Sequence, residues 1–533
     1  MKKIALLMAL LFLVAAFVGC SPAANEEGTA DSGQEGAAAS GEAGYKDTIT
    51  VAINTDHYPD DPHNNTGNHR ILTMLYNRLV KRNPDNEIVP DAAESWECSE
   101  DGLTWTFYLK QGIKFHNGKE MTANDVKASF DRLTNEEDPL AYTSSFAFIE
   151  STNVIDDYTV EIKLKYPVAP MLANLTATQA SIMDADIIAE YGRDIGTAPE
   201  NTIGTGPYMM VNRITDQEVN LVANENYFEG APLTKNLKFL VVKEESSRSI
   251  ALETGEVDII TSMSPSETVR LDALDGFHAE ITPSVGQHNF CFNYTHPIIK
   301  DPKIRQAINY CIDHQAIIDA LWSEVGYTAC ISALSPNVWG YVDLGVIEQD
   351  YDKAKELLAE AGYPDGFTFQ AIASSIYAKN GEVLEMIAEQ LKPVGIIVDI
   401  QVIDSTTFSS MQTLTPEQAE FGMICCGLGP SSADAHEAYA RSFITPDNGM
   451  NGSNIGFYSN AEVDALIEQG AQEMDEEKRL DIYKRIQEII YLEDPGGIWV
   501  YDTKNINVMT DNVEGYELDI RGMINFQKMR IKE

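Results

Sequence analysis

Residues 89–118 read VPDAAESWECSEDGLTWTFYLKQGIKFHNG. Within this stretch, apolar and polar side chains alternate along residues 104–110, so that Trp105, Phe107 and Leu109 share one face. A period of two predicts a half-buried antiparallel strand. A second strand is predicted to start at residue 113, and the Asn-Gly pair that follows it is typical of a hairpin turn.

Helical and strand patterns mix in both directions from this stretch. Thr122 and Asp125 predict a capping box at the start of a helix. A helix over residues 246–254 is followed at once by a short apolar strand over 257–260. Asp301 predicts the N-cap of a later helix, which has proline in its first turn. This alternation of helices and strands predicts an α/β protein.

Length and charge narrow the class of protein. The chain has 533 residues, which exceeds what one hydrophobic core usually supports, so we expect two or three domains. Its 82 acidic and 38 basic residues give a net charge of −44. So acidic a surface repels phosphate backbones, and we expect no nucleic-acid partner.

The first residues carry a targeting signal. Lys2 and Lys3 precede an apolar run over residues 4–18, which is too short to span a bilayer comfortably. The run ends at Gly19-Cys20, which resembles the processing site of bacterial lipoproteins. We therefore predict a signal peptide over residues 1–19 and lipidation of Cys20, with a plain signal peptide as the alternative.

A low-complexity segment separates this signal from the rest of the chain. Residues 21–44 consist only of Ala, Gly, Ser, Pro, Thr, Asn, Gln, Asp and Glu, so none of them has a large apolar side chain. Such a segment cannot offset the entropy of ordering, so residues 20–44 are predicted to be a lipidated flexible tether with a reach of about 25–30 Å.

The other cysteines give no metal or haem pattern, because none of them forms a CxxC motif. Several lie in apolar runs and are predicted to be buried thiols. Cys425 and Cys426 are adjacent, and we favour two packed thiols over a vicinal disulfide there.

Six motifs in order carry a resemblance to a known family. They are the stretches at residues 89–107, 112–118 with 122–126, 204–208, 301–313, 351–366 and 458–464. Through them the chain resembles the family 5 extracellular solute-binding proteins, the oligopeptide, dipeptide and nickel-type binding proteins of ABC importers. The resemblance runs across nearly the whole chain after the tether.

The resemblance implies a fold and a domain arrangement. It implies a periplasmic-binding-protein-like fold of the large class, type II, with two lobes and an extra subdomain on lobe 1. We place lobe 1 at residues 45–90, 202–283 and 497–533, the subdomain at 91–201, and lobe 2 at 284–495. Because the chain passes twice between the lobes, we expect a hinge that closes on a ligand.

One segment of the predicted lobe 2 indicates which kind of ligand the protein binds. In peptide-binding members of the family, the run after residues 421–424 carries a Trp and then an Asp that pairs with the peptide's amino terminus. An ungapped register puts Cys426 at the Trp and Ser431 at the Asp, with Gly427 and Leu428 between them. A hydroxyl does not replace a carboxylate facing a buried ammonium, which argues against ordinary free-amine peptides. Asp434 is a substitute if the loop shifts.

Further ligand-binding candidates lie on predicted loops at the face between the lobes. They are Tyr58, Met263, Gln287, Asn289, Trp339 and Tyr341. A single aromatic residue is more often part of a core than of a ligand site. We also predict that Asp434→Ala weakens binding more than His57→Ala does.

The segment from residue 56 to 69 allows two interpretations, a metal site or a solvated loop. His57, His63 and His69 lie there with three aspartates, Asp56, Asp60 and Asp61. Their spacing fits no metal-ligand template, so we favour the solvated loop and predict no metal site.

The sequence predicts a function with several alternatives. We predict an extracytoplasmic lipoprotein, on the outer face of the cell membrane or in the periplasm, that gives a peptide or peptide-like solute to an ABC permease and ATPase. The alternatives are a sugar, an opine-like conjugate or a chelated metal as the solute, a ligand sensor, or an extracellular hydrolase. No HExxH or GxSxG motif occurs, so we expect no enzyme and no cofactor. We expect a monomer.

Overall fold

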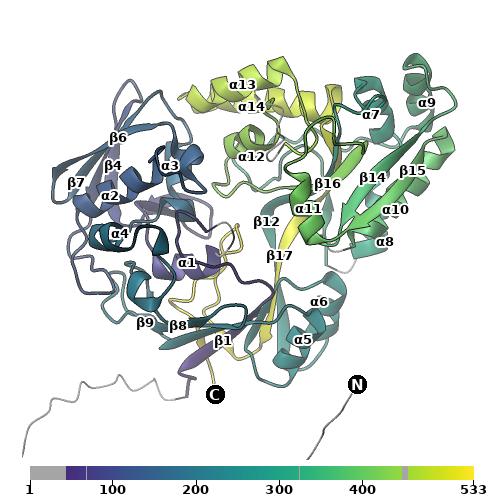
Figure 1. Ribbon diagram of the computed structural model, residues 1–533. Helices are drawn as coiled ribbons and strands as arrows, with labels where there is room; N and C mark the ends of the chain where they lie inside the picture. The colour runs from purple at the N-terminus through teal and green to yellow at the C-terminus, as the bar shows by residue number, and fades with distance from the viewer. Residues whose placement is uncertain (1–43, 66, 68, 323–324, 378, 447–453) are drawn as a thin grey trace, which may run out of the picture. The chain divides into compact units, whose positions relative to one another are not determined.

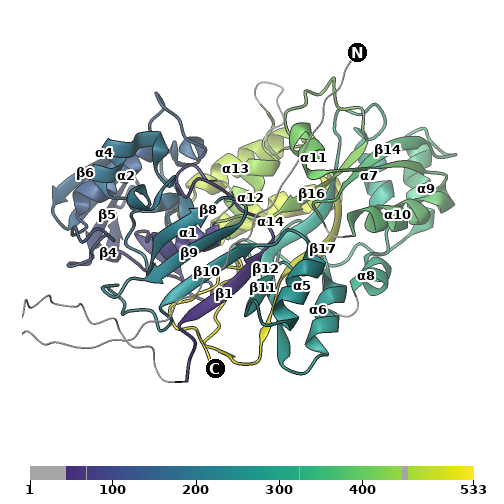
Figure 2. The ribbon, with the colours of Figure 1, turned by 60° about the horizontal axis from the view of Figure 1, so that its bottom comes forward.

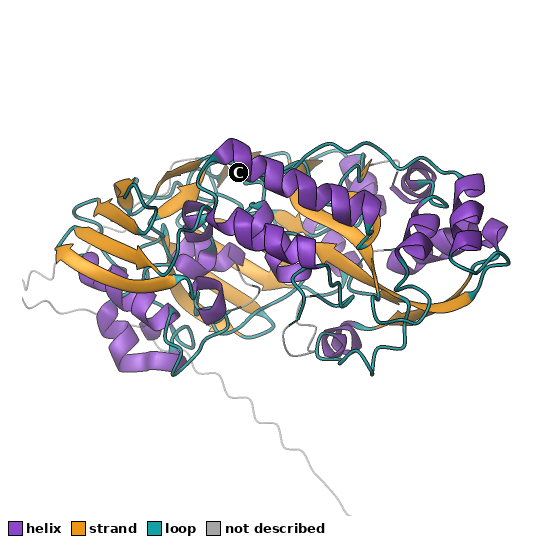
Figure 3. Cartoon of the chain, turned by 90° about the horizontal axis from the view of Figure 1, so that it is seen from above, coloured by secondary structure: helices purple, strands orange, loops and turns teal. Residues whose placement is uncertain are grey.

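The computed structural model describes residues 44–65, 67, 69–322, 325–377, 379–446 and 454–533. The predicted signal peptide and Cys20 lie outside these residues, as does the predicted tether up to residue 43. Strands and helices alternate through the described chain (Figures 1 and 3), as the α/β prediction requires.

An eleven-stranded sheet forms the framework of the molecule. Its order is β15-β14-β16-β12-β17-β11-β1-β10-β9-β8, with β13 paired to β17. Its two long central strands are β12 (Phe277–Phe292) and β17 (Gly497–Thr510). The other strands are β1 (Thr48–Ile53), β8 (Tyr208–Ile214), β9 (Glu218–Ala223), β10 (Asn236–Val241), β11 (Ile259–Thr261), β13 (Thr328–Ala329), β14 (Thr368–Ser374), β15 (Ile397–Ile403) and β16 (Met423–Leu428).

The strands β12 and β17 belong to both lobes of this fold. Residues 277–283 of β12 pair with 510–504 of β17 beside β11, and residues 287–291 pair with 502–497 beside β16 and β13. The register shifts between Pro283 and Gln287. Because proline has no N–H to donate, a break in the ladder at this position is expected.

The register break in β12 lies near the predicted end of one lobe. The sequence predicts a crossing between residues 283 and 284, and the ladder between β12 and β17 shifts between Pro283 and Gln287. On the return strand, Ile498 and Val500 belong to the same hydrophobic core as Phe290 of β12. The residue bounds of the lobes stay a prediction.

A separate antiparallel sheet lies within the segment predicted as the extra subdomain. Its order is β4 (Ala93–Cys98), β5 (Thr104–Leu109), β7 (Thr159–Leu164) and β6 (Ile149–Asp156). The alternation predicted for residues 104–110 is confirmed, since every second side chain of β5 is buried. The helix α2 (Ala123–Leu133) packs on β6 and β7 (Figure 1), and Asp125 Oδ2 accepts a hydrogen bond from the Thr122 amide at 2.8 Å.

Short two-stranded sheets complete the strand inventory. The hairpin of β2 (Val80–Arg82) and β3 (Ile88–Pro90) leads into β4, and β18 (Val513–Glu514) pairs with β19 (Arg530–Ile531) near the end of the chain.

Helices cover the large sheet on both lobes. In lobe 1, α5 (Glu245–Glu253) and α6 (Pro265–Asp272) lie together beside β11 and β12 (Figure 2). The other helices are α1 (His69–Leu75), α3 (Met171–Leu175), α4 (Ala185–Tyr191), α7 (Pro302–Asn309), α8 (His314–Trp322), α9 (Tyr351–Glu360), α10 (Asn380–Leu391), α11 (Ser405–Met411), α12 (Ala435–Ser442), α13 (Ala461–Gln472) and α14 (Glu476–Glu488).

Two ion pairs, each with a buried arginine, join elements that are distant in the sequence. At the start of α7, Asp301 is the N-cap as predicted, and Arg305 in the same helix pairs with Asp494. The second pair joins Arg479 of α14 to Asp434, the N-cap of α12. A buried charge of this kind costs several kcal/mol if its partner is removed.

Candidate ligand-binding site

The end of β16 and the start of α12 form one side of a pocket. Gly429 and Pro430 follow the strand, and proline stops its ladder because it cannot donate a hydrogen bond. The chain then turns into α12, where Asp434 accepts a hydrogen bond from the His436 amide at 2.9 Å. This strand-loop-helix unit presents backbone and side chains from residues 426–442 to one cavity.

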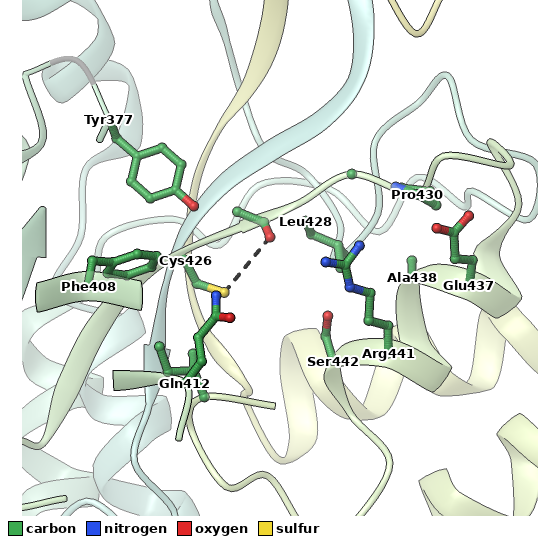
Figure 4. A pocket seen from close by; sticks show the side chains of 13 residues that line it. Tyr377, Phe408, Gln412, Cys426, Leu428, Pro430, Glu437, Ala438, Arg441 and Ser442 are labelled. Atoms are coloured by element: carbon green, nitrogen blue, oxygen red, sulfur yellow. Dashed lines mark hydrogen bonds between the residues drawn. The ribbon is translucent and has the colours of Figure 1, made fainter. Parts of the chain in front are cut away.

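The cavity has a volume of about 270 Å³. This lies just below the range of roughly 300–1,000 Å³ that is usual for small-molecule sites. Figure 4 shows its lining side chains, which come from β16, the loop after it, α11, α12 and the loop after β14. They belong to Tyr377, Phe408, Gln412, Cys426, Gly427, Leu428, Gly429, Pro430, Glu437, Ala438, Arg441, Ser442 and Ile455.

Two opposite charges project into this pocket from α12. The Glu437 carboxylate accepts hydrogen bonds from Ser431 Oγ at 2.8 Å and from the Ser432 amide at 2.7 Å. Arg441 lies four residues further on, and Figure 4 shows its guanidinium turned toward Leu428 while Glu437 lies on the Pro430 side. The pocket can therefore meet both a cationic and an anionic group of a ligand.

A thiol forms part of the same wall. Cys426 lines the pocket, and a hydrogen bond with Cys291 on the neighbouring strand β12 lowers the pKa of the Cys426 thiol. The same hydrogen bond, together with burial, raises the pKa of the Cys291 thiol. Cys425 and Cys426 are separate thiols in this structure, in agreement with the favoured prediction for this pair.

A residue from the segment predicted as lobe 1 contacts the loop beside this pocket. The Arg82 guanidinium in β2 donates two hydrogen bonds to the Ser432 carbonyl, at 2.6 and 3.1 Å. Burial raises the pKa of Tyr142, which lies in the segment predicted as the subdomain, and a hydrogen bond with Gln179 opposes that shift.

Four of the eleven predicted ligand-binding residues lie at this pocket. Cys426, Gly427 and Leu428 are part of its lining. Ser431 is held beside it by its hydrogen bond to Glu437. Ser431 has no carboxylate, but the carboxylate of Glu437 in the first turn of α12 lies next to it.

Asp434 and Trp339 lie together but in a different environment. The Asp434 carboxylate receives two hydrogen bonds from Arg479, at 2.6 and 3.0 Å, and is almost fully buried. The same guanidinium lies 4.1 Å from the centre of the Trp339 ring. Asp434 therefore already has a cationic partner within the protein, and its role in ligand binding stays a prediction.

Gln287 and Asn289 are buried side by side on β12. Gln287 Nε2 donates to Asp502 Oδ1 at 2.9 Å, and Asn289 Nδ2 lies 3.5 Å from Cys291 Sγ. Their side-chain oxygens have no hydrogen-bond partner among the described residues.

The remaining three candidates lie away from the pocket. Met263 is buried in the core under α5 and α6. Tyr341 packs beside the α12–α14 core, where burial raises its pKa to about 12. Tyr58 is 46% exposed, and its hydroxyl donates to the Thr197 carbonyl at 3.2 Å. For these three positions the ligand-binding assignment also stays a prediction.

The histidine-rich loop is built of ion pairs with arginine. Asp56 and Asp60 both pair with Arg213, and Asp61 pairs with Arg132. His63 is fully buried, and burial lowers its pKa to about 4. Within the described part of the chain, no group of three or more His, Cys, Asp or Glu side chains is arranged to hold a metal ion. The solvated loop expected from the sequence is instead a largely buried cluster, because the arginines neutralise its carboxylates.

Sequence reasoning missed the pocket residues contributed by α11, α12 and the loop after β14. Glu437 and Arg441 carried the clearest signal that could have found them, since charges four residues apart lie on one face of a helix. Tyr377, Phe408 and Gln412 carry no such signal, because only the packing of lobe 2 brings them to β16.

Residues 87–450 match the family model of bacterial extracellular solute-binding proteins, family 5. This chain is a family 5 solute-binding protein. The resemblance seen in the six motifs is thereby confirmed, and so is the two-lobe fold of the ABC-transporter binding proteins.

Several family 5 proteins are similar over almost their whole length. The glutathione-binding protein GsiB of Salmonella typhi is 28% identical over 474 residues, which cover 88% of this chain and 91% of GsiB. The heme-binding protein A of Haemophilus influenzae is 28% identical, with 83% and 84% covered. The structure of DppA from Helicobacter pylori in complex with the peptide STSA is 25% identical with a TM-score of 0.78, and the match covers 91% of this chain and 98% of DppA.

Membership in this family establishes the general role and location of the protein. It is an extracytoplasmic solute-binding protein, and the similar proteins are binding proteins rather than enzymes. Within the described residues, every helix is too short or too polar to cross a bilayer.

Proposed function

We propose that this chain captures a small peptide-like solute in the pocket between β16, α11 and α12, and delivers it to an ABC importer. The observation that carries the proposal is the pocket itself, which is small and combines apolar walls with a carboxylate and a guanidinium. Peptide chemistry offers matching groups, because a short peptide carries amides, two charged ends and compact side chains. A glutathione-binding relative and a peptide-bound structural neighbour support the same class of solute.

The role is binding and release rather than turnover. Tyr377, Gln412, Cys426 and Ser442 are the neutral polar or thiol side chains of the pocket. The pocket's lining residues include no histidine, so they do not provide the Ser-His or Cys-His pair that nucleophilic catalysis generally uses. Closure of the two lobes on the solute then gives the permease a shape to recognise.

The protein acts at the outer face of the membrane, where a lipid on Cys20 anchors it. The basic residues, the apolar run and Gly19-Cys20 support this anchor. Fractionation of the producing cell tests it: Cys20→Ser should move the protein from the membrane fraction to the soluble fraction. Equal membrane retention of both forms would rule out the lipid.

Native mass spectrometry of the purified protein tests the binding proposal. We expect a retained solute of peptide-like mass, lost in Ser442→Trp because the indole fills the pocket. Ser410→Trp is the matched control, since Ser410 is exposed on the face of α11 away from Phe408 and Gln412. Retention of the solute by Ser442→Trp would place binding elsewhere and overturn the proposal.

A further inference from the structure

A pair of thiols on neighbouring strands forms part of the pocket wall. Asn289 of β12 lies directly opposite Cys426 of β16, and Cys291 lies opposite Ile424. Because side chains two residues apart on a strand point to the same side, Cys291 and Cys426 are diagonal neighbours on one face of the sheet. A hydrogen bond joins the two thiols.

The two thiols differ in their access to solvent. Cys426 is half-buried and lines the pocket, whereas Cys291 is 9% exposed. Figure 4 shows the Cys426 sulfur among the lining side chains, with a dashed line to the Gly427 carbonyl oxygen, 3.9 Å away. A contact of this length is weak and leaves the sulfur available. A small molecule in the pocket can therefore reach the sulfur of Cys426, while that of Cys291 stays inside the protein.

The buried thiol acts as a hydrogen-bond donor to the pocket thiol. Asn289 Nδ2 donates to Cys291 Sγ at 3.5 Å, so the Cys291 sulfur already accepts a hydrogen bond and its own proton is left for Cys426. This donation stabilises the Cys426 thiolate, and the pKa of the Cys426 thiol is lowered. The thiolate is the form of cysteine that attacks disulfides, and a pKa closer to the ambient pH increases its amount.

The other described cysteines do not combine access with a stabilised thiolate. Cys98 is exposed at the end of β4, but burial and the charge of Asp101 raise the pKa of its thiol. The cysteines that are fully buried are Cys311, Cys330 and Cys425. The chain therefore contains its own reference thiol, since Cys98 is more exposed than Cys426 but lacks the hydrogen bond from a second cysteine.

We propose that Cys426, assisted by Cys291, is a site of reversible S-thiolation, at which a low-molecular-weight disulfide forms a mixed disulfide with the protein. The Cys426 thiolate attacks one sulfur of the small disulfide, and a new S–S bond forms while the old one breaks. The other half of the molecule leaves as a thiolate and takes up a proton from water. The small disulfide is itself the oxidant, so the exchange is balanced, and an excess of small thiol reverses it.

Strand geometry favours this mixed disulfide over a bond between the two cysteines. Diagonal neighbours on antiparallel strands lie about 7–8 Å apart, whereas the Cα atoms of a disulfide usually lie within about 7 Å. A bridge from Cys291 to Cys426 would therefore require backbone movement between two internal strands of the large sheet. Oxidising conditions outside the cytoplasm preserve disulfides. If the pocket holds the solute, as proposed above, an adduct on its wall excludes that solute.

Exchange with bis(2-hydroxyethyl) disulfide tests the proposal. The protein is freed of solute and carries Cys20→Ser, so that residue 20 adds no thiol. Peptide mapping by mass spectrometry gives the rate of addition at Cys426 and at Cys98 from neutral to alkaline pH. We expect Cys426 to reach half of its maximal rate at a lower pH than Cys98, and to react at least about threefold faster at pH 7. Dithiothreitol should remove the adduct.

Variants separate the role of Cys291 from simple exposure. Cys291→Ala removes the hydrogen-bond donor, so addition at Cys426 should slow by about threefold or more at pH 7, and its pH profile should move toward that of Cys98. Cys291→Ser keeps a donor and should restore most of the rate. Cys311→Ala is the matched control, because Cys311 is fully buried and does not line the pocket. Melting temperatures verify folding, and the comparison of Cys426 with Cys98 needs no variant.

Several outcomes would overturn the proposal. They are the absence of an adduct at Cys426, a disulfide between Cys291 and Cys426 in its place, the same pH profile at Cys426 and Cys98, and an unchanged rate in Cys291→Ala.

The proposed function is tested separately, with solute recovered from the purified protein. That solute should bind the unmodified protein and not the adduct, which native mass spectrometry measures. An adduct that still binds the solute would support S-thiolation and contradict the proposed location of the solute. If no solute is recovered while the adduct forms, the proposed function fails and S-thiolation stands.

Discussion

At the scale of single residues, the structure changes what Asp434 is expected to do. The sequence offers it as a carboxylate for the ligand, whereas in the fold it is bound by Arg479 and caps α12. A buried pair with one partner removed leaves an uncompensated charge, which costs about 3–5 kcal/mol.

We therefore expect Asp434→Ala to lower the free energy of unfolding by about 3–5 kcal/mol in urea titration. His57→Ala, at an exposed position, should change it by less than about 0.5 kcal/mol. The double variant Asp434→Ala/Arg479→Met should recover part of the loss, because no charge is left unpaired. An unchanged unfolding free energy for Asp434→Ala would contradict this structural role and would favour a role of Asp434 in ligand binding.

A second residue-scale effect concerns pH. Burial raises the pKa of Asp502 to about 6, although a hydrogen bond from Gln287 opposes the shift. In the unfolded chain an aspartate titrates near 3.9. The folded protein therefore binds the proton more tightly, and stability falls as the pH rises through this interval.

Asp502→Asn removes this penalty. Its stabilising effect should be about 2 kcal/mol larger at pH 8 than at pH 4.5, where Asp502 is still mostly protonated in the folded protein. Urea titrations of both proteins at the two pH values measure the difference. Asp85→Asn, at an exposed aspartate in the turn between β2 and β3, is the control and should give a pH-independent offset. A constant offset for Asp502→Asn would contradict the raised pKa.

At the scale of elements, the Gly204-Thr205-Gly206 motif is explained by close approach. The amide of Gly206 donates to the Leu75 carbonyl at the end of α1 at 2.9 Å, and a Cβ on Gly206 would lie 2.3 Å from the Met74 carbonyl oxygen. A backbone atom cannot move aside as a side chain can. The motif therefore fixes α1 against the strand β8 that follows it.

Gly206→Ala should destabilise the protein by about 1–3 kcal/mol, because it overpacks this junction. Gly381→Ala is the matched control in α10, where the added Cβ would lie 3.4 Å from the Val402 Cγ2 atom. That variant should be neutral or stabilising by up to about 1 kcal/mol. Equal melting temperatures for the two variants would disprove the close-approach explanation.

At the scale of the whole molecule, Arg82 joins the segments that the sequence predicts as lobe 1 and lobe 2. Its two hydrogen bonds to the Ser432 carbonyl cross from lobe 1 to the loop that precedes α12. Hydrogen bonds from a charged group contribute about 1.5–3 kcal/mol, which is enough to shift an open-closed equilibrium by at least about tenfold.

Without solute, Arg82→Met should therefore have a larger radius of gyration than the wild-type protein in small-angle X-ray scattering. Added solute should reduce the radius for both proteins, since it stabilises the closed form. Lys81→Met is the control, because Lys81 pairs with Glu229 of the same lobe. A radius that solute does not change would contradict hinge closure.

Local patterns in the sequence identify single elements and the family. The alternation along β5, the cap at Asp301 and the order of six motifs specified strands, helix starts and the family. Local rules were less accurate at the ends of elements: the helix predicted over residues 246–254 is α5 (Glu245–Glu253), and the strand predicted over 257–260 is β11 (Ile259–Thr261).

Which side chains meet at the pocket, and which charged groups pair with each other, depends on the three-dimensional fold. Asp434 and Arg479 are 45 residues apart, and Tyr377 lies far in sequence from Arg441, so no local pattern records their contacts. The sequence specifies the chemistry of each side chain, but whether one charge neutralises another depends on the distance between them in the folded protein. The family could therefore be predicted from the sequence, whereas the positions of Glu437 and Arg441 at the pocket could be seen only in the folded structure.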